Sequence, residues 1–327
     1  MWHFGAEFTM RLYRCLSDFH GSERGIALAI GNFDGFHVGH QAVINAMKDK
    51  AQRMGLQSAV MIFEPQPLEF FGKKVPARLF SLRDKLRIFR AYGVDIVFCM
   101  SFTRKFAALN DVEFVDLLQN KLNVKSVTVG SQFSFGKAGA YTFTDLERCC
   151  HAVGIECSKV HKVEEDGVRI SSTLLRSLIQ AGDFFTAQKF MGHPYSISGR
   201  VVHGNALGRT LGFPTANINL NRRVCPLSGV YAVQVKCVYG EYWGVANVGH
   251  RPTVNTTDML HSLLEVNLID FNGDLYGKSI EVVFYFKLRD EMKFDGLDAL
   301  VKQMTADKER AHYLLENMQH YEQVHLA

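Results

Sequence analysis

Two histidines at the start of an expected helix are the residues of this chain best suited to chemistry. They lie in the segment Gly31–His40, which reads GNFDGFHVGH and follows the apolar run Ile26–Ile30. An amphipathic stretch comes next, so the segment is predicted to turn from a buried strand into a helix. Backbone N–H groups at a helix start bind anions, and His37 and His40 can both donate hydrogen bonds to one phosphate group. With Gly39 letting phosphates approach the backbone, the pattern predicts a nucleotide site for attack at a phosphorus atom.

A second motif, Arg169–Arg176, reads RISSTLLR and carries three hydroxyl side chains between arginines at another expected helix start. Such residues can bind phosphate and neutralise the charge of a leaving group. Each motif also has an ordinary structural explanation: polar residues at a helix start for the histidines, and Ser/Thr N-capping for the hydroxyls. Together they predict an adenylyl-transfer site, with the histidines on one side of a triphosphate and the hydroxyls with Arg176 on the other.

A glycine-rich stretch in the second half of the chain predicts another phosphate site. It holds Gly204, Gly208 and Gly212, the last two within the string GRTLGFPTAN. The chain has no Walker A sequence, but the backbone amides of a glycine-rich loop can still cradle phosphates. Thr215 and Asn217 offer a hydroxyl and an amide oxygen, which suit Mg²⁺ shared with ATP phosphates. The structural alternative is a Gly/Pro turn in a barrel.

A carboxylate on a mostly apolar strand favours the functional explanation. Glu265, Asn267 and Ile269 share one face of the run Leu264–Phe271 if that run is a strand. The pattern predicts that Glu265 is an interior-facing functional group.

The composition favours a globular enzyme. The chain has 327 residues, of which 47% are hydrophobic and 21% charged, and its net charge of +4 comes from scattered basic residues. This balance suits small anionic substrates and predicts neither a nucleic-acid nor a membrane partner. No apolar stretch reaches membrane-spanning length, and residues 1–24 lack a signal-peptide core. The seven cysteines have no regular spacing, so reduced thiols and a cytoplasmic location are expected, while the oligomeric state is left open.

Alternating strand and helix patterns predict a parallel sheet, and hence an α/β fold, for the first part of the chain. Short apolar runs are separated by amphipathic segments, as in sheets with helices on both faces. The expected strands are Ile26–Ile30, Ser58–Phe63, Asp95–Met100 and Ser126–Val129, and the expected helices are 41–54, 82–91 and 112–122. Ligands of such sheets bind beyond the carboxyl ends of the strands, where His37 and His40 lie.

After residue 194 the pattern changes to short alternating runs, which predict an antiparallel β-barrel closed without an exposed edge. The expected strands include 229–239, 241–248, 262–271 and 279–286, with turns at 239–240, 272–273 and 276–277. Asn272-Gly273 in particular predicts a hairpin. A final helix near 297–318 is expected to pack on the barrel, and the domain boundary is expected near 185–196.

These motifs resemble the bacterial bifunctional riboflavin kinase/FAD synthetase family. GNFDGFHVGH, FEPQP, VGSQFSFG and ISSTLLR match its nucleotidyltransferase-like half, while GRTLGFPTAN, EVNLIDF and DLYG match its kinase half, and the likeness runs from Arg24 to Ala311. It implies a Rossmann-like FMN adenylyltransferase domain over 1–186 and a riboflavin kinase β-barrel with a terminal helix over 187–327. The barrel would phosphorylate riboflavin to FMN with ATP and Mg²⁺, and the first domain would adenylylate FMN to FAD and release pyrophosphate.

The resemblance also implies roles for individual residues. Glu265 is the expected general base of the kinase, and His37 and His40 are expected to stabilise the transition state of adenylyl transfer. The residues expected around ATP in adenylyl transfer are Gly31, Phe33, Asp34, Gly39, Ser171, Ser172, Thr173 and Arg176. Those expected around ATP in the kinase are Gly204, Gly208, Gly212, Thr215 and Asn217, with Thr215 and Asn217 as Mg²⁺ ligands. Arg289 and Glu291 match a family segment near the flavin.

Two positions depart from the family pattern, which usually has Asp or Asn at the position of Gln132 and a second acidic residue near Tyr141. One alternative is therefore a riboflavin kinase whose adenylyltransferase half only binds nucleotide or flavin. A second is a flavin- or nucleotide-sensing protein, which predicts loss of Glu265 or of a histidine. A third is an aminoacyl-tRNA-synthetase-like ligase, which predicts tRNA-binding appendages and a basic face.

Overall fold

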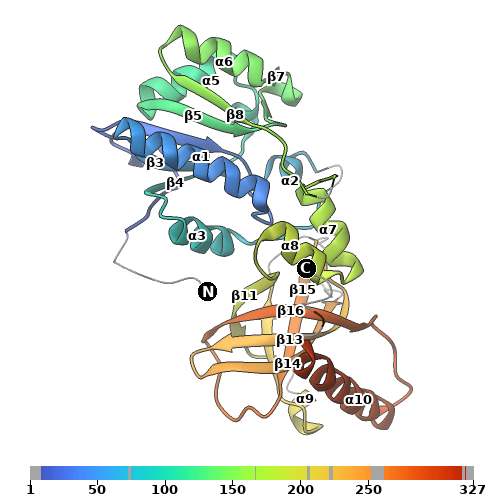
Figure 1. Ribbon diagram of the computed structural model, residues 1–327. Coiled ribbons are helices and arrows are strands. Elements are labelled where there is room, and N and C mark those ends of the chain that lie inside the picture. Colours follow the sequence, from blue (N-terminus) through green and yellow to red (C-terminus); the bar gives the residue numbers. More distant parts are fainter. Residues whose placement is uncertain are drawn as a thin grey trace. The chain divides into compact units, whose positions relative to one another are not determined.

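The chain folds into two compact units in a computed structural model that describes residues 9–72, 75–165, 167–204, 207–220, 224–251, 261–318 and 321 (Figure 1). The first unit contains the described residues up to Pro76 together with Lys85–Ser171. The second contains Ala77–Asp84 and the described residues from Ser172 onward. A short segment from early in the sequence therefore belongs to the second unit. A functional boundary between residues 186 and 187 stays a prediction.

A six-stranded parallel sheet forms the centre of the first unit. Its strand order is β1-β4-β3-β2-β5-β8. The strands are β1 Arg11–Tyr13, β2 Ile26–Ile30, β3 Gln57–Phe63, β4 Ile96–Met100, β5 Val124–Gly130 and β8 Glu156–Val160. The four central strands are those that the apolar runs predict. Because the chain proceeds from β2 to β3 on one side and reaches β5 on the other, β2 lies at the point where the strand order reverses.

Helices and short elements complete the first unit. The helix α1 Val38–Met54 packs against β2, β3 and β5 through its buried side chains Val43, Ile44, Met47 and Ala51. The further helices are α2 Pro67–Phe71, α4 Arg104–Ala107, α5 Asp111–Asp116 and α6 Phe143–Ala152, and α3 Leu82–Ala91 begins in the second unit and continues in the first. Short 3-10 turns lie at Leu16–Asp18 and Lys137–Gly139, and a π-helical segment, Leu117–Lys121, follows α5 directly. Two small ribbons pair β6 Ser134–Phe135 with β7 Tyr141–Thr142 and β9 Glu164–Glu165 with β10 Val168–Arg169.

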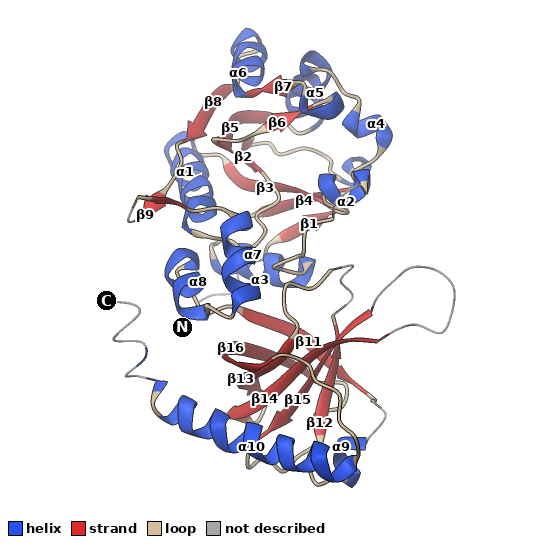
Figure 2. Cartoon of the chain, turned by 90° about the vertical axis from the view of Figure 1, so that its right-hand side faces the viewer, coloured by secondary structure: helices blue, strands red, loops and turns tan. Residues whose placement is uncertain are grey.

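The second unit is built on a closed antiparallel barrel with the strand order β11-β12-β15-β14-β13-β16. The strands are β11 Ser196–Val202, β12 Thr215–Asn219, β13 Gly229–Cys237, β14 Gly240–Arg251, β15 His261–Leu268 and β16 Ser279–Arg289. The helices are α7 Ser172–Ala181, α8 Phe184–Met191, α9 Leu207–Thr210 and α10 Leu297–Glu316. In Figure 2 α10 runs along the barrel, where it contacts β13, β14 and β16. The sequence therefore predicted the barrel and its terminal helix correctly.

One predicted hairpin is wrong. Tyr239-Gly240 does connect the paired strands β13 and β14. Asn272-Gly273, however, lies between β15 and β16, and these strands pair with other neighbours: β15 with β12 and β14, and β16 with β11 and β13. Closure of the barrel separates the two strands, so tertiary pairing overrides the local turn signal.

None of the helices among the described residues combines the length and the apolar character that a membrane span requires.

Candidate active sites

Polar side chains form a row across the outer face of the barrel. Arg289 pairs with Val230, Val230 with Asn247, Asn247 with Glu265, and Glu265 with Asn217, so one rung crosses five strands. Side chains of directly paired residues lie on the same face of a sheet. The next rung places Thr215 beside Asn267 and Asn267 beside Val245. Register therefore brings together the residues that the two kinase motifs supply from distant parts of the sequence.

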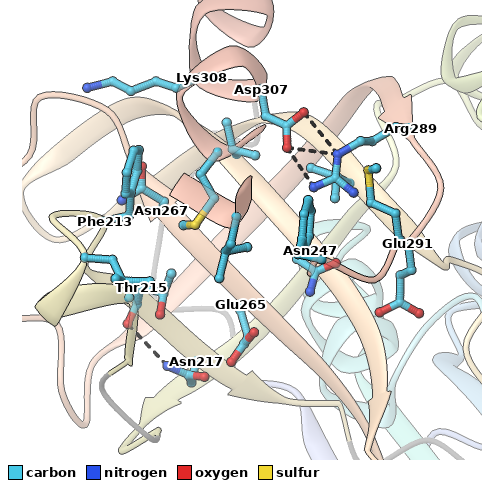
Figure 3. Close-up of a pocket in the computed structure, with 18 residues that line it drawn as sticks. Phe213, Thr215, Asn217, Asn247, Glu265, Asn267, Arg289, Glu291, Asp307 and Lys308 are labelled. Carbon is cyan, nitrogen blue, oxygen red and sulfur yellow. Dashed lines mark hydrogen bonds and ion pairs between the residues drawn. The ribbon is translucent and has the colours of Figure 1, made fainter. Parts of the chain in front are cut away.

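The row opens into a cavity of about 310 Å³ between the barrel wall and α10 (Figure 3). Its wall is polar on one side, with Thr215, Asn217, Asn247, Glu265 and Asn267, and includes Arg289, Glu291, Asp307 and Lys308 elsewhere. Apolar side chains supply the rest of the lining: Leu211, Phe213, Val230, Val245, Met292, Phe294, Leu300 and Met304. A cavity with an apolar lining and a few convergent polar groups suits a ring system that carries a polar tail.

Glu265 faces this cavity and not the barrel lumen. Its neighbours Leu264 and Val266 are fully buried on the opposite face of β15. Val230, which lies on the same rung as Glu265, belongs to an apolar cluster that includes Ala311 and Leu315 of α10. The prediction that Glu265 faces the barrel interior is therefore wrong: the residue is half-buried and lines the cavity on the outer face, because the interior face of β15 is taken by its apolar neighbours.

The glycines of the kinase motif make room for the other residues of the site. A Cβ on Gly204 would lie 2.5–2.7 Å from the side-chain amide of Asn217, and a Cβ on Gly208 would lie 2.4 Å from the carbonyl oxygen of Phe213. Gly212 has a φ of +83°, which a residue with a side chain adopts only with strain. These positions hold the loop close to Thr215 and Asn217, and Gly208 itself lines the cavity.

Arg289 is held by contacts with α10. Its Nε donates to both carboxylate oxygens of Asp307, at 3.1 and 3.0 Å, and its Nη2 donates to Oδ2 at 2.8 Å. Glu291 lies just beyond β16, with its Oε1 only 2.6 Å from where a Cβ on Gly249 would be. Both residues that the sequence assigned near the flavin therefore line the cavity.

The first unit carries its motif at the carboxyl end of β2. Phe33 and Phe36 have positive φ angles of 49° and 38° and are buried, so their rings anchor the turn. A Cβ on Gly31 would lie 3.2 Å from the ring of Phe33, and a Cβ on Gly39 would lie 3.1 Å from the ring of His37. Both glycines thus leave room for neighbouring rings of the motif, which is a packing reason that the sequence pattern did not reveal.

His37 is the N-cap of α1, and its Nδ1 accepts a hydrogen bond from the backbone N–H of His40 at 3.3 Å. The two imidazoles stack with ring centres 3.7 Å apart. Burial lowers the pKa of His37 to about 4, against the opposing effect of the Asp34 carboxylate. His37 is therefore neutral at pH 7, and because Nδ1 is an acceptor its proton resides on Nε2. A neutral imidazole can still donate from Nε2–H, and the role of His37 towards phosphate stays a prediction.

The hydroxyl motif is divided between the units. Ser171 ends the first unit, whereas Ser172, Thr173 and Arg176 start α7 in the second. The Nε of Arg176 donates to the carbonyl oxygen of Ala77 at 2.6 Å, which fixes its side chain at the early segment of the second unit. A joint phosphate site formed with His37 and His40 stays a prediction.

Known proteins match both halves of the chain. A family model described as FAD synthetase matches residues 20–174, and one described as riboflavin kinase matches residues 191–315. A bifunctional riboflavin kinase/FMN adenylyltransferase of Haemophilus influenzae is 45% identical over 305 residues, covering 92% of this chain and 98% of that protein. The chain belongs to this family. The Escherichia coli bifunctional riboflavin kinase/FMN adenylyltransferase is 46% identical over 88% of this chain and 91% of its own length.

A solved structure is similar to this chain over nearly its whole length. A Streptococcus pneumoniae protein described as a macrolide-efflux protein superposes with a TM-score of 0.75, at 31% identity, over 93% of this chain and 98% of its own.

Gln132, where the riboflavin kinase/FMN adenylyltransferase family pattern usually has Asp or Asn, is exposed just beyond β5. Because β5 and β2 pair in parallel, Gln132 follows β5 at the same carboxyl end of the sheet where the histidine motif follows β2.

Sequence reasoning missed the contribution of α10 to the kinase cavity. Leu300, Met304, Asp307, Ala311 and Leu315 recur at helical spacing, and all but Asp307 are apolar. A lone acid inside an apolar stripe is a signal for a buried polar contact. Asn247 was also missed, since only its pairing with Glu265 reveals it.

Proposed function

We propose that this chain is a bifunctional flavin-cofactor enzyme that makes FMN from riboflavin and then FAD from FMN, each with ATP. The observation that carries the kinase half is the cavity in which Glu265, Thr215 and Asn217 converge with an apolar wall. Glu265 accepts the proton of the ribityl 5′-hydroxyl as that oxygen attacks the γ-phosphorus of ATP, the bond from this phosphorus to the β,γ-bridging oxygen breaks, and ADP leaves. The ring system occupies the apolar part of the cavity, towards Arg289 and Glu291.

The residues of the kinase cavity fit Mg²⁺. Asn217 is 5% exposed, its Nδ2 donates to the carbonyl of Thr215, and its buried Oδ1 has no hydrogen-bond partner among the described residues. An unsatisfied amide oxygen beside the Thr215 hydroxyl is a hard ligand pair of the kind Mg²⁺ prefers. Mg²⁺ held there would offset the negative charge of the ATP phosphates. Thr215 and Asn217 orient the nucleotide relative to Glu265, which pairs directly with Asn217.

In the first unit the phosphate of FMN attacks the α-phosphorus of a second ATP, and pyrophosphate leaves. A phosphate oxygen is already a nucleophile, so the histidines have no proton to remove. His37 donates through Nε2–H, and His40 with the first backbone amides of α1 stabilises the charge that develops at phosphorus. Gly31, Phe33, Asp34 and Gly39 shape the turn that precedes α1.

The same proposal extends to location and partners. We infer a cytoplasmic enzyme whose partners are riboflavin, FMN and ATP and that uses neither nucleic acid nor a membrane. All seven cysteines lie in the described part of the chain and none forms a disulfide, which suits a reducing compartment.

The test is an incubation of the purified chain with riboflavin, ATP and Mg²⁺, with all three flavins followed by chromatography. FMN that appears first and is then converted to FAD is the expected result. Accumulation of FMN without FAD would refute the adenylyltransferase half and point to the Gln132 departure. Unchanged riboflavin would refute the kinase half.

A further inference from the structure

A charged network ties α10 to the wall of the kinase cavity. The side chain of Asp307 is 7% exposed and that of Arg289 is 20% exposed, and the two form a bidentate pair. Gln303, one turn earlier on α10, donates from Nε2 to Asp307 Oδ1 at 2.9 Å. The backbone carbonyl of Asp290 accepts from Arg289 Nη1 at 3.0 Å. Figure 3 shows the contacts between Arg289 and Asp307. The Gln303 amide and the Asp290 carbonyl add one further contact to each partner of this pair, which fixes its geometry.

Stability alone does not account for this network. The neighbouring positions of α10 on the same face are apolar: Met304 lines the cavity and Ala311 belongs to the apolar cluster with Val230. Replacing a buried ion pair by apolar residues of similar size is often neutral or stabilising. A carboxylate inside the apolar stripe is therefore explained by what it does to Arg289, which lines the cavity.

The hydrogen bonds leave part of the guanidinium available. Arginine has five N–H donors: one on Nε and two on each terminal nitrogen. Asp307 accepts from Nε and from one N–H of Nη2, and the carbonyl of Asp290 accepts from one N–H of Nη1. Two donors therefore have no partner among the described residues. Bidentate contact with Asp307 also fixes the plane of the group, so the direction of these two donors is fixed as well.

The position of Arg289 identifies which end of the substrate it meets. Arg289 and Glu265 lie on one rung but three strands apart, which is roughly 14 Å at about 4.8 Å per strand. Thr215 and Asn217 lie on the far side of Glu265 from Arg289. The proposed function puts the ATP phosphates at that far side, beside Thr215 and Asn217. Arg289 would then meet the ring end of riboflavin, whose carbonyl oxygens are hydrogen-bond acceptors.

We propose that Asp307, supported by Gln303, is a positioning residue that orients the Arg289 guanidinium towards a carbonyl oxygen of the flavin ring. The inference rests on the proposed riboflavin kinase function. Asp307 itself does not touch the substrate. Its effect is on riboflavin binding and not on phosphoryl transfer, which takes place three strands away.

Steady-state kinetics of Asp307→Asn test this. Loss of one charge-assisted hydrogen bond predicts a rise in the KM of riboflavin of about tenfold, equivalent to about 1.4 kcal/mol, with kcat and the KM of ATP within about twofold of the parent. Glu309→Gln is the matched control, since it removes the same charge from an exposed position of α10 and is expected to change nothing. Conversion of FMN to FAD in the same preparation reports on the first unit.

A double-mutant cycle separates positioning from a structural effect. Arg289→Ala is expected to raise the KM of riboflavin, and adding Asp307→Asn to it is expected to raise that KM no further. Additive effects, an unchanged KM in Asp307→Asn, or an equal change in both substrates' KM would overturn the inference. If Asp307→Asn does not fold, Gln303→Met decides: a severalfold rise in the KM of riboflavin supports the inference and no rise overturns it. A parent chain that leaves riboflavin unphosphorylated would instead refute the proposed function.

Discussion

Replacing His37 by asparagine tests the environment that the structure assigns to the helix start in the first unit. His37 is 7% exposed, caps α1 and has a pKa of about 4, because burial disfavours the imidazolium. Asparagine is a good N-cap but does not titrate. His37→Asn therefore keeps the cap and removes the proton-binding site.

The size of the effect follows from the two pKa values. An unfolded histidine has a pKa of 6.5, so below that pH the unfolded chain binds a proton that the folded chain does not bind until about pH 4. The stabilising contribution of the neutral ring is complete above about pH 6.5 and is lost as the pH falls towards 4. From pH 7 to pH 5 the loss is about 2 kcal/mol, since each pH unit in this window costs about 1.4 kcal/mol.

Urea unfolding at pH 7 and at pH 5 measures this loss of unfolding free energy, with hydrogen–deuterium exchange of peptides from the first unit as the readout. Between the two pH values the parent is expected to lose about 2 kcal/mol more of its unfolding free energy than His37→Asn. All other titrating groups are the same in the two proteins, so their contributions cancel when the two losses are compared. Equal losses in the two proteins would show that His37 titrates normally and would refute the buried, neutral donor.

Three further substitutions test the two sites. Glu265→Gln is expected to reduce FMN formation by about 10²–10⁴-fold while FMN is still converted to FAD, and loss of both activities would contradict separate sites. His40→Ala is expected to do the reverse, with a fall in FAD formation of about 10²–10³-fold, and normal FAD synthesis would exclude its role. Gly204→Ala is expected to raise the KM of ATP in the kinase reaction, because its Cβ would meet the Asn217 side chain, whereas Gly296→Ala, whose Cβ would meet nothing within 4 Å, is the control. Steady-state assays of each half-reaction measure all three.

The sequence predicts those parts of the fold that bury continuous apolar runs. β2 runs from Ile26 to Ile30 as predicted, and all five of its residues are buried. The edge strands β1 and β8 were missed because neither has a fully buried residue, so they carry little apolar signal, and β1 is only three residues long. The wrong hairpin at Asn272-Gly273 has a different cause, because a turn signal contains no information about which strands close a barrel.

The candidate sites, like the fold, could be predicted only in part from the sequence. Motif spacing was sufficient to select Glu265, Thr215 and Asn217, which the cavity brings together. The face on which Glu265 lies could not be predicted, because a shift of one residue in register exchanges the two faces of a strand. Asp307 was missed since its partner Arg289 is distant in sequence and only the packing of α10 brings them together.

The segment Ala77–Asp84 means that a single cut in the chain cannot separate the two units. The backbone crosses from one unit to the other three times, after residues 76, 84 and 171. The carbonyl of Leu79 accepts from the Tyr195 hydroxyl at 3.3 Å, and the ring of Phe80 stacks with His193 and Tyr195. A ribosome finishes this segment long before it makes the rest of the unit to which the segment belongs. The early part of the coding sequence therefore encodes a piece of the second unit. If the gene were divided into two cistrons, one for each unit, this piece would have to be transferred to the second cistron.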